Sequence, residues 1–200
     1  MSEVLSLRVG RLRTPIGEMV IAEDYEGNLR AVDWTDYETR MLALLRLHCG
    51  NNRFRLDPRS EHTEAICTLD RYFQGDLAAI DSLPVKTAGT LFQRQVWQAL
   101  RGIPCGTTTT YGGLARQIGR PKSCRAVGLA NGSNPVGVVV PCHRVIGSNG
   151  ALTGYGGGIG RKLWLLKHEA GAVSWLPLSS TGSSLTPVNG PASKRRWCSD

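Results

Sequence analysis

Polar and apolar residues alternate over short stretches in the first third of the chain, as they do in strands with one buried face. Three such stretches, residues 5–9, 18–22 and 29–34, are separated by the turn-forming runs Thr14-Pro15-Ile16-Gly17 and Glu26-Gly27-Asn28. The pattern therefore predicts a small antiparallel sheet at the N-terminal end.

The pattern then changes to the spacing of three and four residues that is typical of amphipathic helices. This spacing predicts one helix over 36–48 and a second over about 60–74, with Ser60 as the N-cap of the second. Residues 75–90 show no such period and contain both glycine and proline. We expect them to connect two halves of the molecule.

The second half begins with helical patterns joined by short breaks. A helix capped by Thr90 is expected to run to about residue 101, and a shorter one to cover 111–118 before Gly119. The next helix is expected to carry Pro121 in its first turn and to end near residue 131. Two short helices joined by a tight turn form a candidate helix-turn-helix, although two ordinary packed helices fit the same pattern.

The last third of the chain predicts a buried strand, a loop and a final helix. The strand is expected over 138–140, ended by Pro141, and a glycine-rich loop follows over 147–160. The helix expected over 160–170 is predicted to turn four residues inward: Ile159, Leu163, Leu166 and Ala170.

Together these elements predict a mixed α/β protein of the α+β kind. An N-terminal domain with a small antiparallel sheet and helices is expected over 1–77, followed by a connector over 78–89. Residues 90–170 are expected to form a helix-turn-helix domain. Residues 171–200 are rich in serine, threonine and glycine, and a disordered tail is expected there.

Composition limits the class of protein. The 200 residues contain no apolar stretch long enough to span a membrane and no signal-peptide pattern, so we expect a soluble cytoplasmic protein. The six cysteines include no Cys-x-x-Cys spacing and form no tight metal-ligand pattern with the four histidines. Neither a disulfide framework nor a metal site is expected, and most cysteines are predicted to be small buried apolar residues.

Charge divides the chain into two unequal halves. Residues 1–87 hold 11 Lys and Arg against 14 Asp and Glu, whereas residues 88–170 hold 10 Lys and Arg against a single acid. A basic half of this kind is typical of proteins that bind a polyanion, most often nucleic acid, although a solvated basic face has the same composition.

Cys142 follows the predicted buried strand and stands beside His143. A thiol attacks as the thiolate, and an adjacent imidazole can take its proton. Neighbouring residues of an extended strand point to opposite faces, so His143 would reach the thiol only in a bend or through a water. Taken alone, the pair fits a structural cysteine beside a surface histidine better than it fits a nucleophile.

The single acid of the basic half is Glu169, near the end of the last predicted helix. The helix dipole disfavours a carboxylate there by roughly 0.3 kcal/mol or more. Its spacing from Leu166 predicts an inward position. Such an acid either orients a catalytic base or forms an ordinary salt bridge with one of the arginines.

The run Val138-Val139-Val140-Pro141-Cys142-His143-Arg144-Val145-Ile146 resembles the active-site signature of the O6-alkylguanine-DNA alkyltransferases, or methylated-DNA–protein-cysteine methyltransferases. The resemblance covers about 1–170 and is most specific in the second half. Other segments fall in the family's order and spacing: Thr14-Pro15-Ile16-Gly17, Tyr72-Phe73-Gln74-Gly75, Phe92-Gln93-Arg94-Gln95-Val96-Trp97, Thr110-Tyr111, Arg125-Ala126-Val127-Gly128, Asn134-Pro135, Gly154-Tyr155 and Trp164-Leu165-Leu166-Lys167-His168-Glu169.

The resemblance implies both a fold and a reaction. The N-terminal domain would be ribonuclease-H-like and the C-terminal domain a winged helix-turn-helix. The reaction would be DNA repair by direct reversal, in which an alkyl group moves irreversibly from O6-alkylguanine, or O4-alkylthymine, to Cys142 after the base is flipped out of the duplex. Each molecule would act once, as a methylated-DNA–protein-cysteine methyltransferase without a cofactor.

The resemblance also implies catalytic roles. Cys142 would be the alkyl acceptor, and His143, acting through a water, would be its base, held by Glu169. Asn134 would brace the turn around the active site. Tyr111 would help to turn the nucleotide out and would donate a proton to the leaving guanine.

The partner implied is double-stranded DNA, bound largely without regard to sequence. Arg125 would enter the base stack where the flipped nucleotide had been, and the small side chains of its helix would suit the minor groove. The DNA-binding residues expected are Arg94, Thr110, Lys122, Ser123, Arg125 and Ala126. The guanine pocket would be lined by Val140, Val145, Tyr155, Gly156 and Gly157. A monomer is expected, with cooperative assembly on DNA left open.

Departures from the family pattern leave the substrate range open. Gly137 stands where some relatives carry proline, and Gly156 where some carry serine, so the size of alkyl group accepted is not fixed by the sequence. The Cys and His residues do not supply the zinc site of some relatives. A winged-helix regulator without chemistry and a cysteine hydrolase are the alternatives; neither accounts for the whole series of segments.

Overall fold

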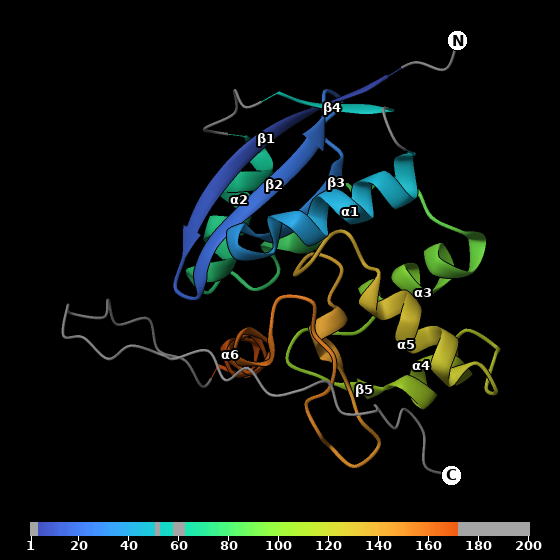
Figure 1. Cartoon of the computed structure of the whole chain (residues 1–200). Coiled ribbons are helices and arrows are strands. Elements are labelled where there is room, and N and C mark those ends of the chain that lie inside the picture. Colours follow the sequence, from blue (N-terminus) through green and yellow to red (C-terminus); the bar gives the residue numbers. More distant parts are fainter. Residues whose placement is uncertain (1–3, 51–52, 58–62, 172–200) are drawn as a thin grey trace.

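The computed structural model describes residues 4–50, 53–57 and 63–171, and the tail expected over 171–200 lies outside them except for Gly171. Figure 1 shows a sheet-containing N-terminal part above a helical C-terminal part. The elements run β1 (Leu5–Thr14), β2 (Gly17–Asp24), β3 (Leu29–Trp34), η1 (Thr35–Tyr37), α1 (Glu38–Cys49), β4 (Phe54–Asp57), α2 (Glu64–Phe73), η2 (Ala79–Ser82), α3 (Leu91–Arg101), β5 (Thr109–Thr110), α4 (Tyr111–Gln117), α5 (Cys124–Gly132), η3 (Cys142–Arg144), β6 (Val145–Ile146) and α6 (Ile159–Glu169).

The N-terminal sheet has the strand order β3-β2-β1-β4. The antiparallel meander β1-β2-β3 is confirmed, with longer strands than expected. Strand β4 was not predicted; it pairs in parallel with β1 at the sheet's edge and covers only four residues. Its four residues are too few for their alternation to stand out from loop sequence.

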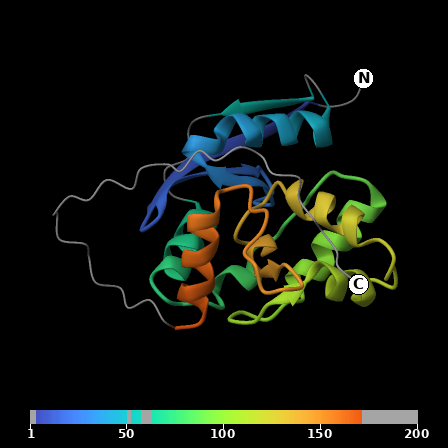
Figure 2. The ribbon, with the colours of Figure 1, turned by 60° about the horizontal axis from the view of Figure 1, so that its bottom comes forward.

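The two faces of this sheet bury different partners. Helix α1 covers one face, where Val20 and Ala22 of β2 lie in one cluster with Met41 and Leu45. The opposite face, which includes Ile21, packs against α2 and the C-terminal half. Figure 2 shows these two layers on either side of the sheet. The period-two alternation of β2 therefore specifies both interfaces at once.

The start of α2 differs from the expected one. The helix begins at Glu64, and Thr63 is its N-cap, with its side chain accepting a hydrogen bond from the backbone N–H of Ile66. The expected cap, Ser60, lies outside the described residues.

The helix-turn-helix helices α4 and α5 are present, but α5 begins later than expected. Pro121 lies in the turn before the helix, which starts at Cys124, because Ser123 donates its backbone N–H to the Arg120 carbonyl and so closes that turn. A two-stranded parallel sheet, β5-β6, lies beside these helices. The mixed α/β fold class with a helix-turn-helix half is confirmed.

The strand expected over 138–140 is absent, and those residues form a tight turn. Val138 has a φ of +68°, and the Val140 N–H donates to the Val136 carbonyl at 3.0 Å. All three valines of the turn are buried, so hydrophobicity alone does not distinguish it from a strand. A β-branched residue in the left-handed region is strained, which requires the surroundings to hold it there.

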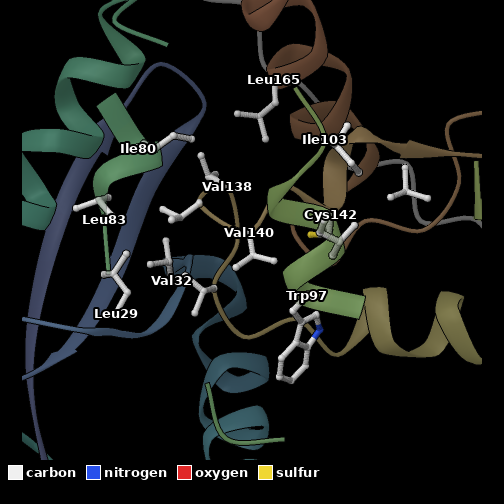
Figure 3. Packing of buried hydrophobic residues seen from close by; sticks show 14 of the residues in the cluster. Leu29, Val32, Ile80, Leu83, Trp97, Ile103, Val138, Val140, Cys142 and Leu165 are labelled. Atoms are coloured by element: carbon white, nitrogen blue, oxygen red, sulfur yellow. The ribbon is translucent and has the colours of Figure 1, made fainter. Parts of the chain in front are cut away.

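The sheet edge supplies part of that support. The backbone N–H of Val32 on β3 donates to the Pro135 carbonyl, and the Gly137 N–H donates back to the Val32 carbonyl, both at 2.9 Å. Figure 3 shows the side chains of Val32, Val138 and Val140 in one cluster with Cys142. Strand β3 is therefore hydrogen-bonded directly to the turn that precedes the candidate nucleophile.

Helix α6 faces inward with a set of residues other than the one predicted. Ile159 and Leu163 are 44% and 42% exposed and Ala170 is also exposed, whereas its buried residues are Lys162, Leu165, His168 and Glu169. The prediction was wrong because three of these four buried side chains are polar or charged and find partners that the sequence does not reveal. The inward position of Glu169 is confirmed.

In the part of the chain that the structure describes, no helix combines the length and the apolar character needed to cross a bilayer.

The expectation of mostly buried cysteines is wrong for three of them: Cys67 is exposed, and Cys49 and Cys105 are half-buried. Cys142 is buried.

The N-terminus of α3 offers a local test of helix capping. The Thr90 side chain accepts from the Gln93 N–H at 3.2 Å, and the Gln93 side chain accepts from the Thr90 N–H at 2.9 Å. We expect Thr90→Ala to lower the free energy of unfolding by about 1 kcal/mol, measured by urea denaturation. Thr90→Ser retains the oxygen and should lose much less; equal losses in the two variants would contradict the capping role.

Candidate active site

The Cys142 thiol lies at the start of the short helix η3, just after Pro141. Only 7% of the residue is exposed, and its neighbours in the core include Val140 and Ile103 (Figure 3). The Cys142 N–H donates to the Val140 carbonyl at 2.7 Å. The chain therefore bends sharply at this cysteine, and the strand geometry that separates Cys142 from His143 does not apply.

Asn134 holds the turn that leads to the cysteine. Its side-chain Nδ2 donates to the Val140 carbonyl at 2.8 Å and to the Val136 carbonyl at 3.3 Å, and its Oδ1 accepts from the Val136 N–H at 3.0 Å. One buried amide thus connects both ends of the turn. Replacing it would leave the buried backbone N–H of Val136 without its partner.

His143 and Glu169 are in direct contact although 26 residues separate them. His143 Nε2 lies 2.8 Å from Glu169 Oε1, and both side chains are fully buried. With Nε2 carrying the proton toward the carboxylate, Nδ1 keeps its lone pair. Among the described residues Nδ1 has no hydrogen-bond partner. The carboxylate therefore orients the imidazole through one nitrogen and leaves the other nitrogen able to accept a proton.

Two further groups bind the same carboxylate. Arg144 forms a two-pronged ion pair, with Nε donating to Oε2 and Nη2 to Oε1, both at 2.8 Å. Tyr72 of α2 donates its hydroxyl to Oε1, also at 2.8 Å. Sequence reasoning assigned neither contact; a signal was available only in the family resemblance, which includes both Arg144 and the Tyr72-Phe73-Gln74-Gly75 run.

The protonation of this cluster follows from its burial and charges. Burial alone would raise the pKa of Glu169, but hydrogen bonds from His143 and Arg144 and their charges lower it far below the usual range. Burial lowers the pKa of His143, which keeps the imidazole neutral and able to accept a proton. Burial raises the pKa of the Cys142 thiol, opposed by a hydrogen bond from Asn134. The thiol therefore needs a base in order to react.

A buried lysine ties the residues after the cysteine to the glycine-rich loop. Lys162 Nζ donates to the Val145 carbonyl at 2.5 Å and to the Thr153 carbonyl at 2.8 Å. The same Thr153 carbonyl accepts from the Tyr111 hydroxyl at 3.3 Å. Burial lowers the pKa of Lys162 to about 8. The sequence did not indicate a structural role for Lys162, because a lysine side chain is ordinarily exposed to solvent.

The loop residues predicted to line a pocket lie against the N-terminal half. A Cβ on Gly156 would come within 2.3 Å of the Arg40 guanidinium, and one on Gly157 within 2.3 Å of Trp34 Nε1. Arg40 is itself held by Asp33 at 2.8 Å. The Tyr155 ring lies edge-on to His143, with centroids 6.4 Å apart. Glycine at position 156 therefore leaves room for the Arg40 guanidinium, which would have to shift to admit a side chain there.

The predicted DNA-binding residues divide into exposed and structural positions. The exposed ones are Arg94, Lys122, Arg125 and Ala126. Thr110 is the N-cap of α4, where its hydroxyl accepts from the Gly113 N–H at 3.0 Å, and Ser123 is half-buried at the N-cap of α5. The structure thus buries the catalytic candidates and leaves the basic candidates exposed, Arg94 on α3 and the others on the helix-turn-helix.

The charge on Glu169 is expected to stabilise the fold. Glu169→Gln leaves Arg144 buried without its counter-ion, and we expect a loss of about 3–5 kcal/mol in the free energy of unfolding at pH 7. Because the folded pKa of Glu169 is depressed, the stabilisation is present above the usual carboxyl pKa of about 4.3 and is lost as the pH falls below it.

Urea unfolding of both proteins across pH tests this expectation. The difference between wild type and Glu169→Gln should stay constant from pH 8 to pH 6 and shrink below roughly pH 4.3. Glu64→Gln, a change at the start of α2, is the matched control. A difference that grew toward acid pH would contradict the buried ion pair.

Comparison with known proteins agrees with this geometry. Residues 7–87 match the family model for the 6-O-methylguanine DNA methyltransferase ribonuclease-like domain, and residues 91–171 match that for its DNA-binding domain. A methylated-DNA–protein-cysteine methyltransferase of Shigella flexneri is 49% identical over 166 residues, which are 83% of this chain and 97% of the relative. One of Methanosarcina acetivorans is 44% identical over 156 residues, 78% of this chain and 94% of the relative.

Solved structures give the same result. The crystal structure of Mycobacterium tuberculosis OGT in complex with DNA matches with a TM-score of 0.68 and 38% identity, covering 82% of this chain and 94% of that one. An O6-methylguanine-DNA methyltransferase from Pyrococcus kodakaraensis matches with a TM-score of 0.64 at 25% identity, covering 82% of this chain and 98% of that one. The chain therefore belongs to the methylated-DNA–protein-cysteine methyltransferase family.

Proposed function

We propose that this chain repairs duplex DNA by moving an alkyl group from O6 of guanine, or O4 of thymine, to the sulfur of Cys142. The observation that carries the proposal is the buried set Cys142, His143 and Glu169, in which the carboxylate takes one imidazole nitrogen and leaves the other free to act as a base. The product is a thioether, so each molecule acts once and no cofactor is needed.

The bond changes balance without any further reactant. His143 Nδ1 takes the thiol proton through a bridging water, and the sulfur electron pair attacks the alkyl carbon. The bond between that carbon and O6 breaks, and its electron pair passes to the guanine. Tyr111 then supplies a proton to the leaving base, and the proton that His143 took from the thiol passes back through water to Tyr111, so that both side chains end neutral. The buried Tyr111 side chain, on the first residue of α4, lies near the glycine-rich loop through its bond to Thr153.

Access to the O6 carbon requires that the nucleotide leave the base stack, at a cost of a few kcal/mol. Val140, Val145, Tyr155, Gly156 and Gly157 would then line the site for the extruded base. Exposed Arg125 on α5 would fill the vacated place in the stack. The small residues of α5, Ala126 among them, would let its backbone approach the minor groove.

Binding is proposed to depend on phosphates rather than on sequence, because damage arises anywhere. The remaining contacts proposed are Lys122, Ser123 and Thr110 of the helix-turn-helix and Arg94 of α3. Affinity should then fall as salt rises, in proportion to the phosphates neutralised. A DNA-binding regulator that performs no reaction would have no need of the buried pair of His143 and Glu169.

The central test follows the alkyl group. The protein is mixed with a duplex that contains one O6-methylguanine, and the peptide carrying Cys142 is weighed by mass spectrometry. We expect one methyl per molecule on that peptide and an equal amount of restored guanine. Cys142→Ala should bind the duplex and transfer nothing. Loss of the methyl from DNA without its appearance on Cys142 would refute the proposal.

The role of Arg125 has its own test. Arg125→Ala should slow repair of a duplex by roughly tenfold while changing repair of a single strand much less, because only the duplex needs the stack filled. Lys122→Ala is the matched control, since the loss of a phosphate contact should weaken binding to both substrates and reduce the salt slope by about one. Equal slowing by Arg125→Ala on both substrates would remove the stack-filling role.

A further inference from the structure

Tyr72 belongs to α2 of the N-terminal half, yet its hydroxyl donates a hydrogen bond to the carboxylate of Glu169 in the candidate active site. The donor Oη lies 2.8 Å from Glu169 Oε1, the same oxygen that lies 2.8 Å from His143 Nε2. The Tyr72 side chain is completely buried. Among the described residues, no other member of the N-terminal sheet or its helices donates a hydrogen bond to this carboxylate.

The backbone at Tyr72 is fixed to the same helix that carries Glu169. His168 Nε2 lies 2.8 Å from the Tyr72 carbonyl, and the His168 ring lies edge-on to the Tyr72 ring at 5.2 Å between centroids. Two adjacent residues of α6 therefore bind Tyr72, His168 at its backbone carbonyl and Glu169 at its side-chain hydroxyl. This leaves the tyrosine little freedom to move away from the carboxylate.

The hydroxyl can only donate in this contact. Burial and the negative charge of Glu169 raise the pKa of Tyr72 well above its ordinary value, so the phenol stays protonated. Oε1 then accepts three hydrogen bonds, from Tyr72, from His143 and from Arg144 Nη2. Oε2 accepts the fourth, from Arg144 Nε. A carboxylate bound in this way cannot rotate without breaking a buried hydrogen bond.

We propose that Tyr72 is a positioning residue for alkyl transfer: its hydroxyl orients the Glu169 carboxylate and withdraws part of its charge, so that His143 stays a neutral base. The inference rests on the proposed function and assigns a chemical task to the N-terminal half. Tyr72 acts through Glu169, the group that accepts the hydrogen bond of its hydroxyl.

The sign of the effect follows from the charges around the pair. Glu169 faces His143, Arg144, Tyr72 and the Cys105 thiol, and His143 also experiences the charges of Arg144 and Lys162. Of these groups, Tyr72 is the neutral donor whose removal leaves every charge in place. Without its hydrogen bond, Oε1 attracts a proton on His143 more strongly, and the imidazolium becomes easier to form.

The measurement is the rate constant of methyl transfer from an O6-methylguanine duplex as a function of pH, with the reactive fraction of each protein counted by complete methylation. We expect Tyr72→Phe to react about threefold or more slowly at pH 7.5. We expect the acid limb of its profile to move to higher pH by about half a unit. Installing 3-fluorotyrosine at Tyr72 gives a stronger donor, and the limb should then move to lower pH.

A neighbouring aromatic residue provides the matched control. Phe73 packs in the same interface, with its ring 5.9 Å from that of Trp164, and no hydrogen bond joins its side chain to the carboxylate. Phe73→Leu should lower the unfolding temperature and the reactive fraction, but leave the acid limb where it is. A purely structural role for Tyr72 predicts the same behaviour for Tyr72→Phe.

The outcomes separate this inference from the function on which it rests. If wild type transfers no methyl to Cys142, the proposed function fails. If wild type reacts and Tyr72→Phe shows the same rate constant and the same acid limb, only the positioning role fails. If Tyr72→Phe does not fold, the fluorotyrosine protein decides: a limb that stays in place or moves to higher pH overturns the inference.

Discussion

The buried carboxylate of Glu169 is the constraint on which the rest of this molecule depends. An ionised group in the interior is tolerated only when its oxygens are fully paired, and here η3 and α2 supply the donors. The pairing determines where η3, α2 and α6 meet. The interdomain packing and the chemistry of the site are therefore two results of one electrostatic requirement.

The sheet edge is the second element of this arrangement. Strand β3 hydrogen-bonds through Val32 to both Pro135 and Gly137, and these bonds hold the turn that Asn134 closes from the other side. Val138 keeps its left-handed conformation between these two supports. The Cys142 sulfur, the proposed alkyl acceptor, lies at the end of this turn, so its position depends on backbone hydrogen bonds as well as on side-chain packing.

The sequence predicted the features that depend on neighbouring residues, but not the conformations and contacts that depend on residues far away in the chain. The period of β2, the Thr90 cap and the isolated acid Glu169 carry their signals within a few residues, and all three were found. The valines at 138–140 have the composition of a strand, and only their tertiary surroundings force a turn. The contacts of Lys162 and Tyr72 were not predicted, because nothing near them in the chain indicates a buried carbonyl or a carboxylate 97 residues away.

That separation of 97 residues has a bearing on how the protein is made. The contacts that orient the imidazole join α2 to the end of α6, so they close only after nearly the whole described chain has been synthesised and packed. A nascent or half-folded molecule would have the Cys142 thiol without the contacts that orient its proposed base, His143. If alkyl transfer proceeds as proposed, it therefore begins only after α2 and α6 have packed together.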